Sequence, residues 1–408
     1  MLRLTDFMNL ILDFGEEWVV TKIEMNHRLK TIHINLEYKS NYYEDPITHN
    51  AAKLYDHCEV REWRHLDILD YKTYIRCRIP RVLCEDGTIK QISIGWADSY
   101  DRHTYQFETR VIDLLKITKN QSKTAEFLNC SFRMVNRIIH RSSERGLSRR
   151  DKRYLLFEHI SIDEKSFHKG QNYVTVLSHP NSGAVIDVCE NRDTESTKNL
   201  LYATFTEAQA KNICSVSMDM WKPYLKAINE VLPDAEIVHD RFHLVKYLNE
   251  SMDKVRRRES VEEKILKDSR YALLKNEQNM TKAQKAKFKL IKESNLEVTK
   301  VWNIRENFKN IFGVNQNDSD AELLLINWAT DSFMNGIKEV NKVILMFLSH
   351  MKGVVNAMIS SYSNAMAERL NGKIQEVKLC SRGYRTFKNF RSAILFFHGG
   401  LDLYPHKW

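Results

Sequence analysis

Residues 157–190, FEHISIDEKSFHKGQNYVTVLSHPNSGAVIDVCE, contain three short apolar runs that decide the fold class. Their length and their Val and Ile content indicate β-strands, and a Pro-Asn-Ser-Gly turn at 180–183 separates the second from the third. A helical stretch follows, and then strand-like ICSVSMD (213–219), helical KPYLKAINEVL (222–232) and strand-like EIVHD (236–240). This β-β-β-α-β-α-β order predicts a mixed five-stranded sheet covered by helices.

The segments on either side of this sheet have different patterns. The first hundred residues carry alternating, β-rich runs, and residues 106–145 change to helical periodicity. Beyond the fifth strand, about a hundred residues combine dense charge with apolar residues at helical spacing. We therefore expect an α/β multidomain protein with an all-α insertion. The expected parts are a β-rich module at 1–100, a helix-turn-helix at 104–150, the sheet-bearing core at 154–243, the insertion at 244–348 and the final helices at 349–408.

The stretch SKTAEFLNCSFRMVNRIIHR (122–141) has a helix-turn-helix pattern. Ala125 allows a close helix approach, Asn129 suits a left-handed turn, and Val135 would face the first helix. Ser131 is a candidate N-cap of the second helix. The side chains expected to face a DNA major groove and its phosphates are Arg133, Asn136, Arg137 and His140. The alternative is an αα-hairpin with a basic outer face.

Composition and charge favour a polyanionic partner. The chain has 408 residues, 43% of them hydrophobic, and a formal net charge of +9. Lys and Arg that neutralise phosphates release counterions, so DNA is the expected partner, although a merely basic protein is the alternative. The N-terminus lacks the pattern of a secretory signal, and no uncharged apolar run reaches membrane-spanning length. Seven scattered cysteines fit a reducing cytoplasm, without a membrane.

Three carboxylates are placed where a sheet could gather them. Asp163 is expected at the end of the first core strand, Asp219 at the end of the fourth, and Glu368 on a late helix. Because the first and fourth strands would be neighbours, their ends would bring the two aspartates together. Clustered hard oxygen ligands suit Mg²⁺ or Mn²⁺. The alternative is that each aspartate is a cap and the glutamate part of a solvated face.

Four further stretches decide between these alternatives. SIDEKSF (161–167), SMDMWKPYLKAI (217–228), IVHDRFHLVKYLNE (237–250) and SNAMAERLNGKIQEVKLCSRGYRTFKNF (363–390) closely resemble the catalytic blocks of a bacterial insertion-sequence transposase family. That family is founded on the element ISL-three. The N-terminal half, including YDHCEVREWRHLDILDYKTYIRCRIPRVLC (55–84), also resembles the family.

The resemblance implies a DDE transposase with an RNase H-like core. In such an enzyme Asp163, Asp219 and Glu368 would bind two Mg²⁺ or Mn²⁺ ions. The long gap between Asp219 and Glu368 agrees with a helical insertion. Asp240 and His243 form an Asp-x-x-His signature, in which the histidine would support the scissile phosphate or the fold. The alternative for His243 is a core or helix-start histidine.

The N-terminal module departs from the family pattern. Its counterpart usually resembles a zinc ribbon with two cysteine pairs, whereas here NYYEDPITHN (41–50) replaces the first pair and Cys84 lacks a partner. Structural zinc needs about four N or S ligands. We therefore expect a degenerate, zinc-ribbon-like module without zinc.

Two other groups have open alternatives. Trp302 and Trp328 could stack on an unpaired base, or lie in the core of the insertion. Arg382, Arg385 and Lys388 are expected to face the DNA backbone, or to form a solvated basic face.

The sequence thus predicts a transposase that binds the terminal inverted repeats of its element, cuts at their ends and joins them to target DNA. Such reactions need two ends held together, so a homodimer or larger assembly on double-stranded DNA is expected, in a bacterial cytoplasm and nucleoid. One alternative is a transposase-derived regulator that binds DNA without cutting. Another is a structure-selective RNase H-like nuclease.

Overall fold

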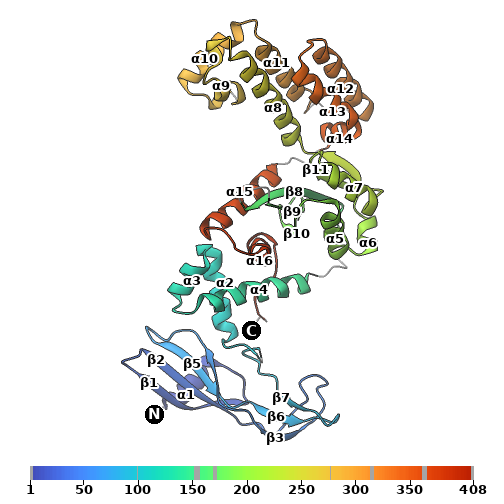
Figure 1. Ribbon diagram of the computed structural model, residues 1–408. Coiled ribbons are helices and arrows are strands. Elements are labelled where there is room, and N and C mark those ends of the chain that lie inside the picture. The colour runs from blue at the N-terminus through green and yellow to red at the C-terminus, as the bar shows by residue number, and fades with distance from the viewer. Residues whose placement is uncertain are drawn as a thin grey trace. The chain divides into compact units, whose positions relative to one another are not determined.

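The structure, a computed structural model, shows a chain of two compact units. It describes residues 3–98, 100–150, 157–168, 172–275, 277–312, 317–360 and 365–405, without the side chains of 277 and 365–368. The first unit comprises Met1–Arg149, Leu379–Gly383 and Leu401–Trp408, and the second comprises Arg150–Lys378 and Tyr384–Gly400. Figure 1 labels the elements of both units.

The first unit begins with helix α1 (Leu4–Leu12) and two small sheets. A four-stranded sheet has the order β1-β2-β5-β4, and a three-stranded sheet the order β3-β6-β7. The strands are β1 (Trp18–Asn26), β2 (Thr31–Tyr38), β3 (Lys53–His57), β4 (Arg61–Arg64), β5 (Lys72–Cys77), β6 (Pro80–Leu83) and β7 (Ile89–Gln91). Trp18, Trp63 and Trp96 pack together in the core. The expected strands are present, whereas α1 was not expected.

Three helices complete the first unit: α2 (Tyr105–Thr118), α3 (Gln121–Phe127) and α4 (Phe132–Arg149). Ala125 and Val135 are buried, and Asn129, in the turn between α3 and α4, has a φ of 48°. The Oγ of Ser131 accepts a hydrogen bond from the amide of Met134 at 3.2 Å, which caps α4. The helix pair therefore forms with the small residue, turn and cap that its sequence predicts.

The second unit is built on a five-stranded mixed sheet of order β10-β9-β8-β11-β12. The antiparallel part contains β8 (His159–His168), β9 (Asn172–Ser178) and β10 (Val185–Glu190). β11 (Ser215–Met218) pairs in parallel with both β8 and β12 (Glu236–His239). The connecting helices are α5 (Thr194–Thr204), α6 (Glu207–Lys211) and α7 (Lys222–Val231).

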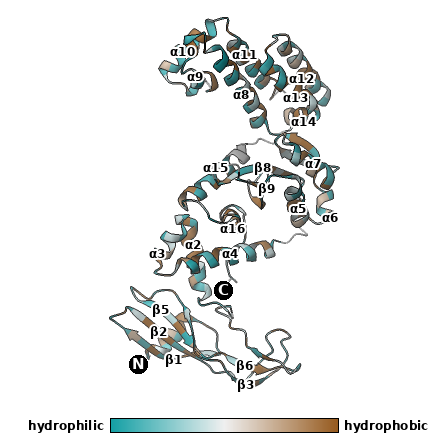
Figure 2. Ribbon diagram, viewed as in Figure 1, coloured by the Kyte–Doolittle hydropathy of each residue, from teal (hydrophilic) through white to brown (hydrophobic). Residues whose placement is uncertain are grey.

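Helices occupy the described chain between β12 and α15. They are α8 (Arg241–Glu259), α9 (Arg270–Leu274), α10 (Lys282–Glu293), α11 (Glu297–Asn310), α12 (Asp318–Phe333), α13 (Lys338–Ser349) and α14 (Met351–Ile359), with short 3₁₀ turns at Lys264–Leu266 and Glu277–Asn279. Hydrophobic and hydrophilic residues interleave along them (Figure 2), and the buried apolar residues form one core. Among the described residues no single helix is long and apolar enough to cross a membrane, although the bent pair α13 and α14 passes that test by length and composition.

The last two helices pack against the antiparallel strands. α15 (Ala365–Cys380) lies beside β8, where Lys165 donates to the carbonyl of Asn371 and Lys378 to that of Ser166, both at 2.9 Å. α16 (Phe387–His398) packs on β10. Its Arg391 forms a two-point ion pair with Asp187. The chain thus returns to the sheet after the helical insertion.

Candidate active site

Asp163, on β8, and Asp219, which directly follows β11, lie at matching positions of two adjacent parallel strands. The β8–β11 ladder ends with the pair Ser161 and Ser217. Each aspartate follows its serine by two residues, Asp163 within β8 and Asp219 directly after the end of β11. Asp163 does not end its strand as expected, since β8 continues to His168 along β9. It lies just past the part of β8 that pairs with β11.

His243 joins the two aspartates. It occupies the first turn of α8, and its Nδ1 lies 3.3 Å from Oδ2 of Asp219 while its Nε2 lies 3.8 Å from Oδ1 of Asp163. Nδ1 forms no hydrogen bond in the described structure, so this contact is electrostatic. Asp240 caps α8 by accepting the amide of Phe242 at 2.7 Å, and its Oδ2 lies 4.0 Å from Nε2 of His243.

Two residues that were not expected from the sequence add to this cluster. The hydroxyl of Tyr247 donates to both oxygens of Asp219, at 3.1 and 3.2 Å. The carboxamide of Asn371 donates to Oδ2 of Asp163. Helical spacing could have indicated both, because Tyr247 follows His243 by four residues and Asn371 follows Glu368 by three.

The pKa values of this cluster reflect its charges. Burial raises the pKa of Asp219, but contacts with His243, the Met220 amide and Tyr247 outweigh it and hold the pKa below its usual value. Burial lowers the pKa of His243, but Asp219, Asp240 and Asp163 outweigh it and raise the pKa. Burial and the charge of Asp219 raise the pKa of Tyr247, whose hydroxyl therefore remains a donor.

Glu368, the third expected acid, lies in the first turns of α15. Its side chain is outside the described residues. The helix itself is fixed to β8 because Lys165 donates to the carbonyl of Asn371 and the carboxamide of Asn371 donates to Asp163. Asp163 is the aspartate beside which Glu368 would have to lie to share a metal ion. The backbone therefore places Glu368 on the helix that contacts Asp163.

Residues 160–394 match the model of the ISL3 family of DDE transposases, described as "Transposase". The chain belongs to this transposase family. The chain is also similar to the transposase for insertion sequence element IS1001 of Bordetella parapertussis, with 26% identity over 81% of this chain and 82% of that protein. The transposase for IS1557 of Mycobacterium tuberculosis is 25% identical over 80% of this chain and 79% of its own length. The family's enzymes cleave and join DNA.

Among solved structures, a Drosophila P element transposase in a strand transfer complex aligns with 76% of this chain and 95% of its own. The TM-score is 0.39 and the sequence identity 8%, which is too low to show a shared fold.

The expected DNA-contacting residues of this transposase differ in exposure. Arg133 and Arg137 on α4 are exposed, as are Arg382, Arg385 and Lys388 near α16. Asn136 and His140 are half-buried, and the carboxamide of Asn136 donates to Gln121 of α3 at 3.1 Å. Asn136 thus contributes to the packing of the helix pair.

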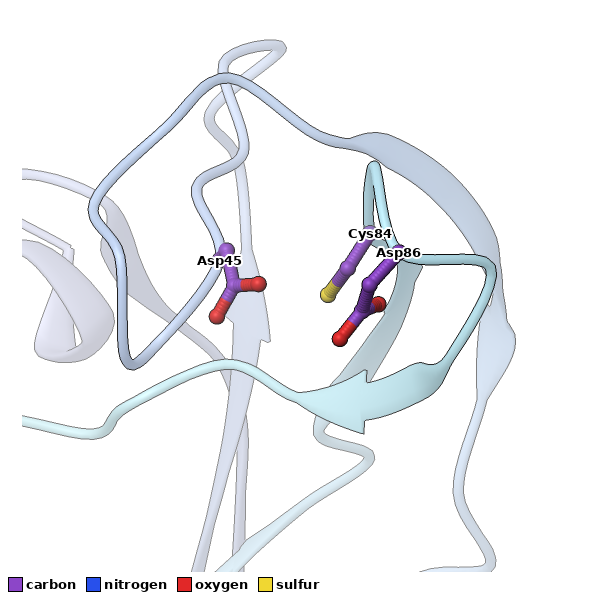
Figure 3. A group of neighbouring side chains, drawn as sticks. All are labelled: Asp45, Cys84 and Asp86. Atoms are coloured by element: carbon purple, nitrogen blue, oxygen red, sulfur yellow. The ribbon is translucent and has the colours of Figure 1, made fainter.

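Among the described residues, the first unit of the transposase holds two other groups of possible metal ligands. One consists of Asp45, Cys84 and Asp86 (Figure 3), whose ligand atoms lie within 4.8 Å of one another. The ammonium of Lys90 lies 2.8 Å from Asp45 and 3.4 Å from Asp86. That hydrogen bond to Lys90 is the main cause that holds the pKa of Asp45 far below its usual value. A lysine of the chain thus supplies the positive charge that this group needs.

The other group is Asp101, His103 and Glu108, all buried. Arg141 forms an ion pair with Asp101. Arg145 forms another with Glu108 at 2.7 Å. These acids are therefore balanced by arginines of α4.

Trp302 and Trp328 contribute to the core of the insertion. Trp328 is 5% exposed, and its indole N–H donates to the carbonyl of Ile304 at 3.0 Å. Trp302 is half-buried against Phe288 and Lys292. The core interpretation therefore holds for Trp328, whereas base stacking on the half-buried Trp302 stays a prediction.

Proposed function

We propose that this transposase binds the terminal inverted repeats of an insertion sequence, cleaves DNA at their ends and joins the ends to target DNA. The observation that carries the proposal is the matched placement of Asp163 on β8 and Asp219 directly after the adjacent parallel strand β11, with His243 between them. The mixed sheet, and helix α15 packed beside it, support an RNase H-like core. We propose that this core comprises 154–243 and 349–408, with the helical insertion at 244–348 between them.

The donor set of this site fits divalent cations. Asp163, Asp219 and Glu368 offer hard oxygen ligands of the kind that Mg²⁺ and Mn²⁺ prefer. Neither aspartate forms an ion pair with a lysine or arginine of the described residues. The chemistry that two such ions supply when bound is activation of a water or 3′-hydroxyl nucleophile and stabilisation of the leaving oxygen.

The chain's own residues orient the site. Tyr247 holds both oxygens of Asp219 and Asn371 holds one oxygen of Asp163, so each carboxylate is fixed in one orientation. His243 lies where its imidazole can support a DNA phosphate between the two acids. Asp240 positions it by capping α8.

DNA binding is proposed for the exposed basic residues of the helix-turn-helix, for the segment before α16 and for the first turn of α16. Arg133 and Arg137 would contact phosphates or base edges, with Ser131, Asn136 and His140 beside them. Arg382, Arg385 and Lys388 would contact the backbone of the DNA. Two ends must be held together, so the active form is proposed to be a homodimer or larger assembly on DNA.

Cleavage of DNA that carries the gene's own flanking ends tests the proposal. Wild type, Asp163→Ala and Asp234→Asn are compared with Mg²⁺ and with EDTA. Asp234 is an exposed turn residue of the same unit and serves as the matched control. We expect Mg²⁺-dependent cutting at the repeat ends by wild type and by Asp234→Asn, and none by Asp163→Ala. Equal cutting by Asp163→Ala would overturn the site, and tight end binding without cutting by any form would indicate a regulator.

A further inference from the structure

Three side chains stack in a row next to Asp219. The guanidinium of Arg192, which follows β10, lies over the ring of Tyr173 at 4.1 Å and over the ring of Trp221 at 4.6 Å. Trp221 follows Asp219 by two residues, and Glu164, which follows Asp163, forms an ion pair with Arg192 at 2.5 Å. The stack of Tyr173, Arg192 and Trp221 is therefore attached to both aspartate-bearing segments.

Several contacts hold the indole in one orientation. The indole N–H of Trp221 donates to the carbonyl of Arg192 at 2.9 Å. Thr194, at the start of α5, donates to the carbonyl of Pro223 at 3.3 Å. The buried hydroxyl of Tyr224 on α7 lies 2.9 Å from that of Thr175 on β9. The start of α7 is thus fixed to the sheet and to the loop that carries Arg192.

The indole is fixed and yet open to solvent. Arg192 covers one face of the ring, but 39% of Trp221 is exposed. Because the indole N–H already has a hydrogen-bond acceptor, the open ring surface is stabilised most by contact with a flat, apolar partner. The open part of Trp221 therefore fits a nucleobase, because every base offers a π-face and stacking on aromatic side chains is a general mode of binding unpaired strands.

We propose that Trp221 is the platform on which a nucleobase beside the scissile phosphate stacks after it leaves the duplex. Bases inside a duplex have both faces covered by their neighbours, so an indole can stack only on an extruded or terminal base. A phosphate that reaches Asp163 and Asp219 brings its flanking nucleotides close to Trp221. Arg192 acts as a positioning residue for the ring. The inference rests on the proposed function of the aspartate pair.

The test compares variants that keep or remove the aromatic face. Trp221→Phe retains a ring, whereas Trp221→Leu retains apolar bulk without one. Tyr202→Ala removes an exposed aromatic side chain from α5 and is the matched control. Each protein is assayed for end cleavage on intact DNA and on DNA with a single abasic site at each nucleotide flanking the scissile phosphate, after its thermal unfolding and DNA binding are recorded.

We expect Trp221→Leu to cleave intact ends about 10- to 100-fold more slowly, while Trp221→Phe loses much less and Tyr202→Ala nothing. An abasic site at one flanking position should restore cleavage by Trp221→Leu, because no base then has to be extruded. The inference would be overturned if Trp221→Leu cleaved intact ends as fast as wild type. It would also be overturned if no abasic site increased the slow cleavage by Trp221→Leu. Asp163→Asn is run in parallel, and its full activity would instead refute the proposed function.

Discussion

The two units each gather acidic side chains, but they balance them differently. In the first unit, Lys90 pairs with Asp45, and Arg141 and Arg145 pair with Asp101 and Glu108. In the second unit, the partners of Asp163 and Asp219 are a histidine and neutral donors. Acids with a resident cation stabilise the fold, whereas acids without one are available to a cation that exchanges. The following predictions test this contrast.

The largest effect is expected at the second-unit pair. Asp163→Asn should reduce end cleavage at least about a thousandfold, because residues that act as one catalytic unit fail together. Its thermal unfolding midpoint should stay equal or rise, since one of two neighbouring negative charges is removed. Cleavage rates and unfolding curves measured on the same preparation check both. A large loss of stability would mean that Asp163 stabilises the fold, as Asp101 and Glu108 do in the first unit.

For Arg145→Met we expect a large loss of stability, in contrast to Asp163→Asn, which should lose cleavage and keep its stability. It leaves Glu108, only 1% exposed, without its arginine. Removing one partner of a buried ion pair costs about 3–5 kcal/mol, so the free energy of unfolding in urea should fall by that order. An unchanged free energy of unfolding would contradict the structural assignment of this group.

A packing defect near the site should lower both the free energy of unfolding and the rate of cleavage. A Cβ at Gly353 of α14 would lie 2.6 Å from the ring of His239, which precedes Asp240. Gly353→Ala should therefore cost about 1–3 kcal/mol of unfolding free energy through overpacking. Because β12 leads directly into α8, cleavage should fall as well. Urea unfolding and cleavage are measured together, and Gly372→Ala, at a site with open space around it, is the control.

The smallest effect is expected at Tyr247. Tyr247→Phe removes a donor to both oxygens of Asp219 and keeps the ring. Loss of a hydrogen bond to a charged group should slow cleavage about tenfold, with unchanged end binding. Single-turnover cleavage and DNA-binding titrations measure the two effects. A loss as large as that of Asp163→Asn would mean that Tyr247 contacts the reacting groups.

Local patterns predicted much of this architecture. The mixed α/β class follows from short apolar runs and their turns, and the α3–α4 turn from Asn129, Ser131 and the spacing of small residues. Each of these signals is contained in a few consecutive residues. Helix α1 was missed because its nine residues are too few to show a clear helical period.

Contacts between distant segments could not be predicted in the same way. Arg192 and Trp221 are far apart in sequence, and nothing local indicates that a guanidinium lies between Tyr173 and the indole. Lys90 is likewise distant from Asp45 in the sequence, so its role as the cation of that group emerges only from the tertiary structure. For Trp302 and Trp328 the sequence left base stacking and core packing as alternatives, and only the packing of the helices shows that Trp328 is buried.

Binding of Mn²⁺ in the presence of a DNA end tests the central contrast most directly. Electron paramagnetic resonance would count bound ions in wild type, Asp163→Asn and Asp45→Asn. The account predicts that wild type and Asp45→Asn bind Mn²⁺ alike and that Asp163→Asn loses it. Retention of all bound ions by Asp163→Asn, or their loss in Asp45→Asn, would contradict the assignment of the exchangeable cation to the second unit.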